Sequence, residues 1–486
     1  MSNKIIWEEI ARRGDNQAIF LIDTAAEGFK RGYIGFDHNI TEFKPLYYRQ
    51  LSGARWFSVS DIADYIKFLK DKEINNPGIL VEYANEFRHR VETMRNYVNI
   101  IKDFDWRNKN NEKLVEVFEK FTNLTRIMWA FAYNYIMVNR FLPDIIFTEI
   151  AKKEFDTFRQ TEIFNILMQL DDSSETRKEK ISLLHIAEIV EKNGYTVEIE
   201  NKIKKHLQNY EYLGQYYFRG QGYTLEIIRQ RINQILQNGV DKEWEKIKKT
   251  EIDVKNSEII KKDLGLNKNV LLYIDSARAQ TWISNFVDES YTYAVYYLKP
   301  LFIEISTRLS ISYKYLLEMR GSEIINSLLQ GKLVVPIEQL DQRLIESAII
   351  LDHDEIKILI GSELEEYKKQ ELQNNVYEDI RELTGQGASS GLAKGLVKLV
   401  LCDADASKVE KGDILLAPAT NPTLVPAMER AGAIVTDEGG LLSHAAIVSR
   451  ELGIPCLVGT KIGTKVFRDG DRVEVDTQRG VIQKIF

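Results

Sequence analysis

The chain has 486 residues and a formal net charge of −7; 44% of its residues are hydrophobic and 28% are charged. This length exceeds one ordinary hydrophobic core, so two to four domains are expected. The negative charge argues against a nucleic-acid binder, the lack of a long apolar run argues against a membrane span, and the two cysteines, Cys402 and Cys456, are too few for a disulfide framework. Charges near the N-terminus do not fit a signal peptide, so we expect a cytoplasmic protein.

Residues 1–80 have a mixed α/β pattern. The apolar runs Ile19–Ile22 and Gly32–Phe36 predict strands, and Ser58–Lys72 predicts a helix with Ser60 as its N-cap.

Residues 81–362 predict a helical body that binds a substrate or a partner. Lys113–Ile150 and Ser276–Leu309 have apolar residues at helical spacing. The polar stretches Asp171–Lys180 and Asn238–Asn267 predict loops or solvated helices.

The composition changes near Gly385. Only two of the 50 aromatic residues, Phe467 and Phe486, lie beyond it, and that part of the chain has 12 basic and 12 acidic residues. We therefore expect a charged helix and a flexible Gly/Ser linker over residues 363–391, and a separate tail domain over residues 392–486.

In the tail domain, short β-type runs alternate with turn signals, a pattern that predicts a compact α/β fold. The expected strands are Leu396–Cys402, Asp413–Ala417, Ala433–Thr436, Cys456–Val458, Arg472–Asp476 and Val481–Ile485, and the expected helices are Pro422–Ala431 and Ser443–Leu452.

His444 falls in the first turn of the second expected helix, with Ser443 as its N-cap. Gly439 and Gly440 permit a sharp turn before that helix. A helix N-terminus offers free N–H groups and partial positive charge, which favour a phosphate attached to the imidazole. The small Ala445 leaves room for a donor. A capping or surface histidine is the more common role for a residue in such a position.

The stretch TDEGGLLSHAAIVSRELGIPCLVGT (436–460) resembles the phosphohistidine signature of the phosphoenolpyruvate-utilising enzymes, a family that includes pyruvate phosphate dikinase, phosphoenolpyruvate synthase and rifampin phosphotransferase. The flanking segments 412–428 and 469–482 agree with it. The resemblance implies a β/β/α swivelling domain in which His444 accepts a phosphoryl group from ATP or phosphoenolpyruvate. It also implies supporting roles for Thr420 and Asn421, which match the family's T-x-P loop.

The body resembles the same family more loosely, over 210–224 and 297–332, which does not identify a substrate. Residues 1–384 do not resemble the family's ATP-grasp nucleotide domain. The resemblance therefore implies a separate ATP-grasp partner chain, with Mg²⁺ at the partner's site, and a small-molecule acceptor. No cofactor-binding motif is recognised in this chain.

Other residues have competing interpretations. Asp437 and Glu438, or Asp403 and Asp405, are candidate Mg²⁺ ligands, although a role as solvated loop acids is favoured. The remaining candidates are Arg450 as a phosphate contact or a helix C-terminal charge, Ser443 as a regulatory phosphorylation site, His353 as a metal ligand, and the aromatic residues of 210–223 and 282–297 as a pocket or as helix packing.

Three hypotheses follow. The first is a phosphotransferase component that carries a phosphoryl group on His444 between a nucleotide or phosphoenolpyruvate site and an acceptor site. The second is a non-catalytic binding or regulatory module that retains the swivelling domain. The third is a body that binds a small organic acceptor and phosphorylates it from an unidentified donor.

Overall fold

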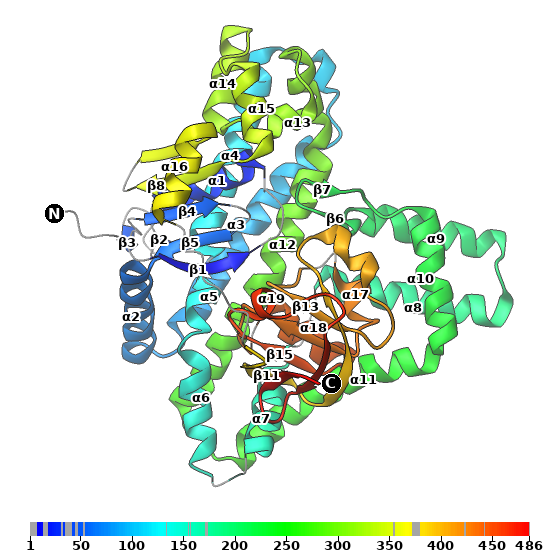
Figure 1. The fold of residues 1–486 in the computed structure, drawn as a ribbon. Helices are drawn as coiled ribbons and strands as arrows, with labels where there is room; N and C mark the ends of the chain where they lie inside the picture. The colour runs from blue at the N-terminus through cyan, green and yellow to red at the C-terminus, as the bar shows by residue number, and fades with distance from the viewer. Residues whose placement is uncertain are drawn as a thin grey trace.

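The computed structural model describes residues 7–12, 18–30, 33–34, 41–43, 47–51, 54–132, 134–153, 155, 157–170, 174–352, 355–371, 380–421, 424–441 and 443–485. A mainly helical body precedes a mixed α/β domain, as the sequence predicts (Figure 1). The helices of the body are α1 (Ile19–Lys30), α2 (Val59–Asn75), α3 (Ile79–Ile101), η1 (Trp106–Asn108), α4 (Asn111–Ala132), α5 (Asn134–Val138), α6 (Leu142–Ala151), α7 (Thr157–Leu167), α8 (Glu175–Asn193), α9 (Val197–Tyr210), η2 (Glu211–Gly214), α10 (Leu225–Asn238), α11 (Val240–Asp263), α12 (Lys268–Arg308), α13 (Tyr313–Leu317), α14 (Gly321–Gln330), α15 (Ile337–Ile345) and α16 (Gly361–Glu371).

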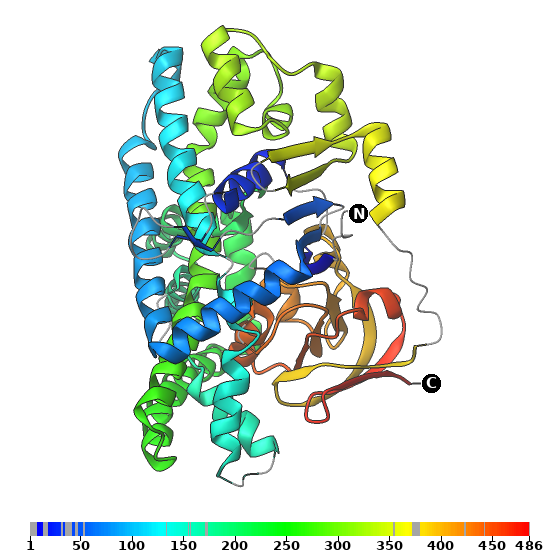
Figure 2. The same cartoon turned by 90° about the vertical axis from the view of Figure 1, so that its left-hand side faces the viewer.

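Long helices α3, α4 and α12 form the frame of the body (Figure 2). Apolar residues three or four positions apart, such as Phe87, Val91 and Met94 on α3, are completely buried between them. Cations of α3 also stack on aromatic rings of α12: the guanidinium of Arg88 lies 4.1 Å from the ring centre of Trp282. The long-range helix packing explains why the aromatic residues of α12 are largely buried.

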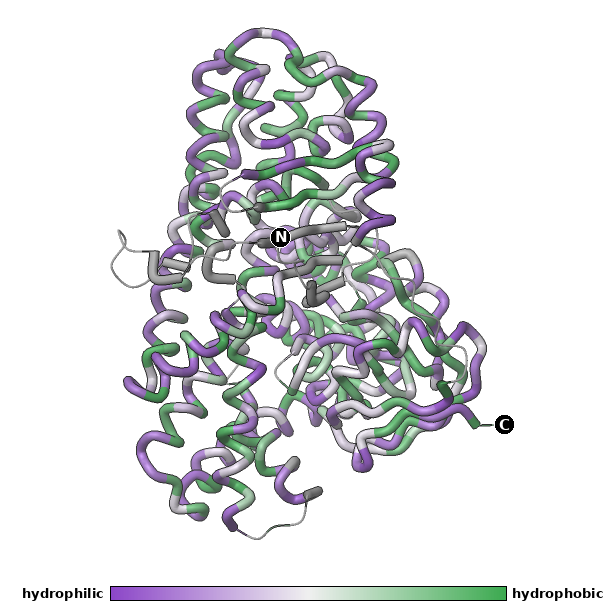
Figure 3. Tube along the Cα trace, turned by 60° about the vertical axis from the view of Figure 1, so that its left-hand side comes forward, coloured by the Kyte–Doolittle hydropathy of each residue, from purple (hydrophilic) through white to green (hydrophobic). Residues whose placement is uncertain are grey.

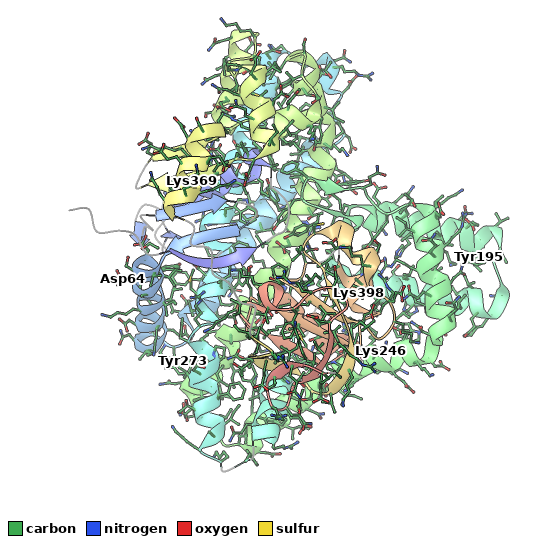
Figure 4. All side chains as sticks on the ribbon, in the orientation of Figure 1. Asp64, Tyr195, Lys246, Tyr273, Lys369 and Lys398 are labelled. Atoms are coloured by element: carbon green, nitrogen blue, oxygen red, sulfur yellow. The ribbon has the colours of Figure 1, made fainter. Side chains whose placement is uncertain are left out.

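Helices α8 to α11 form a lobe with a hydrophobic core of its own, which includes Leu184, Ile203 and Ile232 (Figure 1). Figure 4 shows Tyr195 at the outer end of this lobe and Lys246 at the end near the tail domain. The predicted loop or solvated helix 238–267 is helix α11, which contributes Ile247 to the lobe's core. The lobe is thus a packed unit.

The start of α8 is tied to α12. The carboxylate of Glu289 on α12 accepts hydrogen bonds from the backbone N–H groups of Glu175 and Thr176, each at 3.0 Å. The hydroxyl oxygen of Ser174 accepts a third, from the N–H of Arg177 at 3.1 Å. These acceptors satisfy donors that a helix N-terminus leaves without partners, so the lobe is anchored firmly to the frame. The predicted polar stretch 171–180 therefore includes the first turns of a helix, while 171–173 lie outside the described residues.

The N-terminal segment differs from its prediction in two places. The apolar run Ile19–Ile22 begins helix α1, not a strand, because its side chains are buried against α4. The N-cap of α2 is Ser58, not Ser60, since the Ser58 hydroxyl accepts from the N–H of Asp61 at 3.4 Å. The predicted strand 32–36 is described only at β2 (Tyr33–Ile34), which pairs with β3 (Thr41–Phe43).

A five-stranded sheet joins the N-terminal segment to a distant part of the body. Its order is β1-β5-β4-β8-β9, and β4 pairs with β8 in antiparallel fashion. Its strands are β1 (Trp7–Arg12), β4 (Tyr47–Leu51), β5 (Ala54–Ser58), β8 (Ala348–Asp352) and β9 (Glu355–Leu359). Strands from residues 1–80 therefore share one sheet with the hairpin β8–β9, which the sequence analysis placed in the helical body. A short hairpin, β6 (Gln215–Tyr216) and β7 (Arg219–Gly220), lies between η2 and α10.

The tail domain is built on one eight-stranded sheet in the order β10-β17-β16-β12-β13-β14-β15-β11, in which β12 to β15 are parallel. Its elements are β10 (Glu382–Thr384), β11 (Gln386–Ser389), β12 (Leu392–Leu399), η3 (Asp403–Lys408), β13 (Ile414–Ala417), α17 (Val425–Met428), β14 (Ala433–Thr436), α18 (His444–Leu452), β15 (Cys456–Val458), α19 (Gly463–Val466), β16 (Arg472–Asp476) and β17 (Val481–Lys484). The predicted strands β14, β15 and β16 are confirmed at both ends. The predicted helix 422–431 is described only as α17.

The predicted flexible linker is wrong for residues 386–389. This segment is strand β11, which pairs with β15 at the edge of the tail sheet. Gly387 fits there because a Cβ would lie 2.0 Å from the carbonyl oxygen of Thr477. Gly387 therefore permits close packing of the strand and is not a sign of flexibility. The preceding charged helix is α16, and residues 372–379 lie outside the described residues. The boundary of the tail domain at residue 392 stays a prediction.

The central strands of the tail are buried on both faces, as a parallel sheet requires. On one face, Ile414, Leu416 and Val435 belong to a core that lies inside the tail. On the other face, Leu415 and Ile434 belong to a continuous apolar cluster that extends into the body. Figure 3 shows hydrophobic stretches inside the tail, while hydrophobic and hydrophilic residues alternate along the helices of the body. Helix α18 contacts α11, and β11 contacts α7, so the tail is docked on the body.

Candidate phosphohistidine site

The loop between β14 and α18 places His444. Gly439 has a φ of +94°, and a Cβ there would lie 2.7 Å from the Cβ of Ser443. The Ser443 hydroxyl accepts from the N–H of Ala446 at 3.4 Å, which confirms Ser443 as the N-cap. Helix α18 then begins at His444, as the sequence predicts, and ends at Leu452, followed by the C-cap Gly453 with a φ of +67°. A glycine turn and a cap therefore fix a half-buried histidine at a helix N-terminus.

Thr420 lies next to His444, 24 positions away in the sequence. Its Oγ1 atom is 2.7 Å from Nδ1 of His444. Because β13 and β14 are parallel neighbours, the loops that follow them meet at the same edge of the sheet. The Thr420 side chain is buried, so the imidazole has a fixed partner on one nitrogen. Asn421 follows directly, and its carbonyl accepts from the N–H of Leu424 at 3.0 Å.

Small residues line the start of α18. Ala445 and Ala446, in the first turn of α18, are buried. The side chain of Leu441, in the loop before the helix, is buried as well. A Cβ on Gly440 would lie 3.8 Å from Oε1 of Gln386 and 3.9 Å from the carbonyl oxygen of Asn139 in the body. The turn that bears the histidine thus approaches the helical body closely.

Asp437 is a structural residue in this loop. Its carboxylate accepts from the Thr460 hydroxyl at 3.0 Å and from the backbone N–H of Thr464 at 3.1 Å. Burial raises the pKa of Asp437, and the hydrogen bonds oppose this effect. Its bonds join the loop after β14 to Thr460, before α19, and to Thr464 in α19. The sequence interpretation of Asp437 as a solvated acid is wrong, and its bonds also leave the alternative interpretation as a Mg²⁺ ligand without support.

Asp405 also has a local role. Its Oδ2 accepts from the N–H groups of Leu401 at 3.0 Å and Cys402 at 3.1 Å, and its Oδ1 forms an ion pair with Lys408 at 2.6 Å. It therefore fixes the turn that opens η3. Across the described residues, no group of three or more His, Cys, Asp or Glu side chains is arranged to hold a metal ion.

Arg450 lies on α18 but points back along it. Its guanidinium donates to the carbonyl oxygen of Leu441 at 2.8 Å and to Oδ1 of Asn165 on α7 at 3.0 Å. Burial lowers the pKa of Arg450 to about 10. The residue therefore braces the turn before His444 against the body, a role that sequence spacing did not indicate.

The histidines of the body that the structure describes show no comparable arrangement. His206 is buried between Oε1 of Glu179 at 3.0 Å and the hydroxyl of Ser182 at 2.9 Å, and Arg231 binds both oxygens of Glu179. This network fastens α8, α9 and α10 together. His38 and His353 lie outside the described residues.

The aromatic residues predicted as a pocket or as packing mostly fill the core of the body. Tyr212 and Tyr291 are completely buried, and Tyr291 makes edge contacts with Trp129 and Tyr217, with ring centres 5.5 Å and 5.2 Å apart. Tyr217 has a φ of +53°, and its hydroxyl donates to Asp288.

No helix in the part of the chain that the structure describes is long and apolar enough to cross a membrane.

Comparisons with known proteins match the tail domain. Residues 409–480 match the family model of the PEP-utilising enzyme mobile domain. The tail is 58% identical over 100 residues to a probable phosphoenolpyruvate synthase of Archaeoglobus fulgidus, a match covering 21% of this chain and 13% of that protein. It is 57% identical over 102 residues to phosphoenolpyruvate synthase of Pyrococcus furiosus, covering 21% and 12%. The match thus spans about one eighth of these relatives.

Among solved structures, aconitase X of Thermococcus kodakaraensis in its holo-form covers 22% of this chain and 98% of its own, with 18% identity and a TM-score of 0.18. A likeness this low carries no argument about either fold or function.

Proposed function

We propose that this chain, whose C-terminal domain is a mobile domain of the phosphoenolpyruvate-utilising enzymes, carries a phosphoryl group on Nε2 of His444. The observation that carries the proposal is the contact between Thr420 Oγ1 and Nδ1 of His444, at 2.7 Å. When Nδ1 holds the proton and donates it to Thr420, Nε2 has the lone pair that a nucleophile needs.

The reaction is a displacement at phosphorus. The Nε2 lone pair attacks the phosphorus of ATP or phosphoenolpyruvate, an N–P bond forms, and the P–O bond to the leaving group breaks. The electron pair of that bond departs with the leaving oxygen. In a second displacement, an oxygen of the acceptor attacks the phosphoryl group and the N–P bond breaks, which restores the neutral imidazole.

The surroundings of His444 support this role. His444 is the first residue of α18, a helix of nine residues, so a phosphate attached to it would lie near the partial positive charge of the helix N-terminus. The glycine turn before the helix and the buried Ala445 keep side-chain bulk away from the imidazole. The site therefore combines a fixed nucleophile with a favourable electrostatic field.

We further propose that a separate ATP-grasp chain, with Mg²⁺ in its own site, loads His444 and that the acceptor is a small molecule. The proposal is supported by the helical character of the described body, in which no nucleotide-binding motif was identified from the sequence. The alternative is a binding or regulatory module that keeps the domain without transfer. The cap, the glycine turn and the Thr420 contact favour the carrier, since a silent module has no physical need for this combination.

The test is phosphoryl labelling of the full chain. The protein is incubated with β- or γ-labelled ATP or with labelled phosphoenolpyruvate, with and without candidate ATP-grasp chains. We expect acid-labile, base-stable label that is lost in His444→Ala and kept in His185→Ala, an exposed histidine of the lobe. Absence of label with every donor and partner, or label that persists in His444→Ala, contradicts the proposal.

A further inference from the structure

We propose that the lobe of α8 to α11 is a docking station for the tail domain, held by a releasable ionic contact centred on Lys180. The occupant is the tail of this same chain, and the inference concerns docking alone. It does not depend on whether His444 is phosphorylated.

Lys180 on α8 stands between carboxylates of the two parts. Its Nζ lies 3.3 Å from Oε2 of Glu243 on α11 and 3.6 Å from Oε1 of Glu429, which follows α17 in the tail. The Lys180 and Glu429 side chains are only 23% and 32% exposed, so solvent screens their attraction less than on an open surface. Glu451 on α18 adds further negative charge near Lys180.

The charges of the lobe favour this contact. Burial lowers the pKa of Lys180, but Glu429 and Glu243 outweigh burial and raise the pKa overall. Arg231 on α10 is bound to both carboxylate oxygens of Glu179. Burial lowers the pKa of Arg231, but Glu179 and, more weakly, Glu429 raise it overall. The ion pair between the lobe and Glu429 is made by Lys180.

A second polar contact lies nearer the histidine. Arg450 bonds to Asn165 of α7 at 3.0 Å and to the carbonyl of Leu441, in the loop that leads to His444. Docking is therefore connected mechanically to the turn that bears the histidine. When the tail leaves the body, Arg450 loses Asn165 and keeps the bond within its own domain.

The tail can leave without unfolding. One face of its sheet has a core formed within the tail, including Val397, Phe467 and Val475. The other face packs Leu415 and Ile434 into the apolar cluster that continues into the body, so release would expose apolar surface as well as the polar contacts. The Lys180–Glu429 ion pair, whose two side chains water can solvate, favours the docked arrangement and is lost on release.

The experiment is hydrogen exchange of the full chain, read in peptides from α11, α7 and α18. We expect Glu429→Gln and Lys180→Gln each to accelerate exchange in these peptides by about tenfold, because both remove the attraction. Raising NaCl to about 1 M should accelerate exchange in the wild type more than in Glu429→Gln. Peptides from β16 and β17 should stay unchanged, since these strands pack inside the tail.

Lys178→Gln is the matched control. This lysine lies on the same helix but forms its ion pair with Glu175 of that helix, at 3.1 Å, so its removal should leave exchange at the interface unchanged. Unchanged exchange in both Glu429→Gln and Lys180→Gln would overturn the proposal. So would faster exchange throughout the lobe and tail, because the contact would then stabilise folding and not docking.

His444→Ala separates this proposal from the preceding one. We expect that substitution to abolish phosphoryl labelling and to leave exchange at the interface as in the wild type. Loss of labelling without altered docking tests the carrier, whereas altered docking in Glu429→Gln tests the docking station.

Discussion

Thr420 and His444 are joined by a 2.7 Å contact between Oγ1 and Nδ1, which links the loops that follow two neighbouring parallel strands. The contact fixes the rotation of the imidazole and engages one of its two nitrogens. This contact therefore holds the imidazole of His444 in one orientation at the start of the helix.

Replacing Thr420 by Val should slow phosphoryl labelling by about fivefold, because one hydrogen bond of about 1 kcal/mol that orients the imidazole is lost. Thr420→Ser keeps the hydroxyl and should restore most of the rate. The measurement is the initial rate of label incorporation at fixed donor concentration. Equal rates in Thr420→Val and the wild type would show that the contact does not orient the nucleophile.

Gly439→Ala should destabilise the tail by about 1–3 kcal/mol, since an L-residue is strained at a φ of +94° and its Cβ would lie 2.7 Å from Ser443. Gly440→Ala is the adjacent control, where the nearest atom would be at an ordinary 3.8 Å. The stability of the tail in both variants is measured by urea unfolding, monitored through hydrogen exchange in peptides of the tail. Equal stability of the two variants would refute this explanation of the turn.

Ser443 separates capping from regulation. Ser443→Ala should cost about 1 kcal/mol of stability, because the N–H of Ala446 loses its acceptor. Ser443→Asp keeps a capping oxygen, so stability should be retained, but labelling should slow because like charges repel at the phosphate. Melting temperature and labelling rate distinguish the two effects. Normal labelling of Ser443→Asp would argue against electrostatic control by this residue.

The carboxyl group of Glu318 should make the free energy of unfolding depend on pH. Burial raises its pKa to about 7, while the backbone N–H of Ile19 and the charge of Arg343 lower it. The folded state then holds a proton that the unfolded chain releases near pH 4.5, so stability should fall by about 1.4 kcal/mol per pH unit as the pH rises from 4.5 to 7.

The isosteric Glu318→Gln should remove that slope, whereas the exposed Glu338→Gln should leave it. Urea unfolding between pH 4.5 and 8 measures the free energy. A slope that survives Glu318→Gln would assign the pH dependence to other groups.

Local signals accounted for much of the tail. The Ser443 cap and the strands β14, β15 and β16 were predictable because turn residues bound each apolar run closely. The same reasoning failed at Ile19–Ile22, where burial against α4 makes a short apolar run helical. Periodicity cannot separate these two cases in a run of four residues.

Long-range contacts of the site were beyond sequence spacing. Thr420 was proposed through a family resemblance, not through its distance from His444 along the chain. The Arg450–Asn165 bond joins residues 285 positions apart, and no local pattern indicates it. The burial of Asp437 was not predicted because the residues that donate hydrogen bonds to its carboxylate, Thr460 and Thr464, are brought close to it only by the strand order of the sheet.

The most direct test of the central claim locates the phosphate on the imidazole. Full-length protein labelled with ¹⁵N-histidine is loaded by the donor and partner that give acid-labile label, and its imidazole nitrogens are followed by NMR. We expect one histidine, absent in His444→Ala, to carry phosphorus on Nε2 and to keep its proton on Nδ1 beside Thr420. Phosphorus on Nδ1, or on any other residue, would contradict the account.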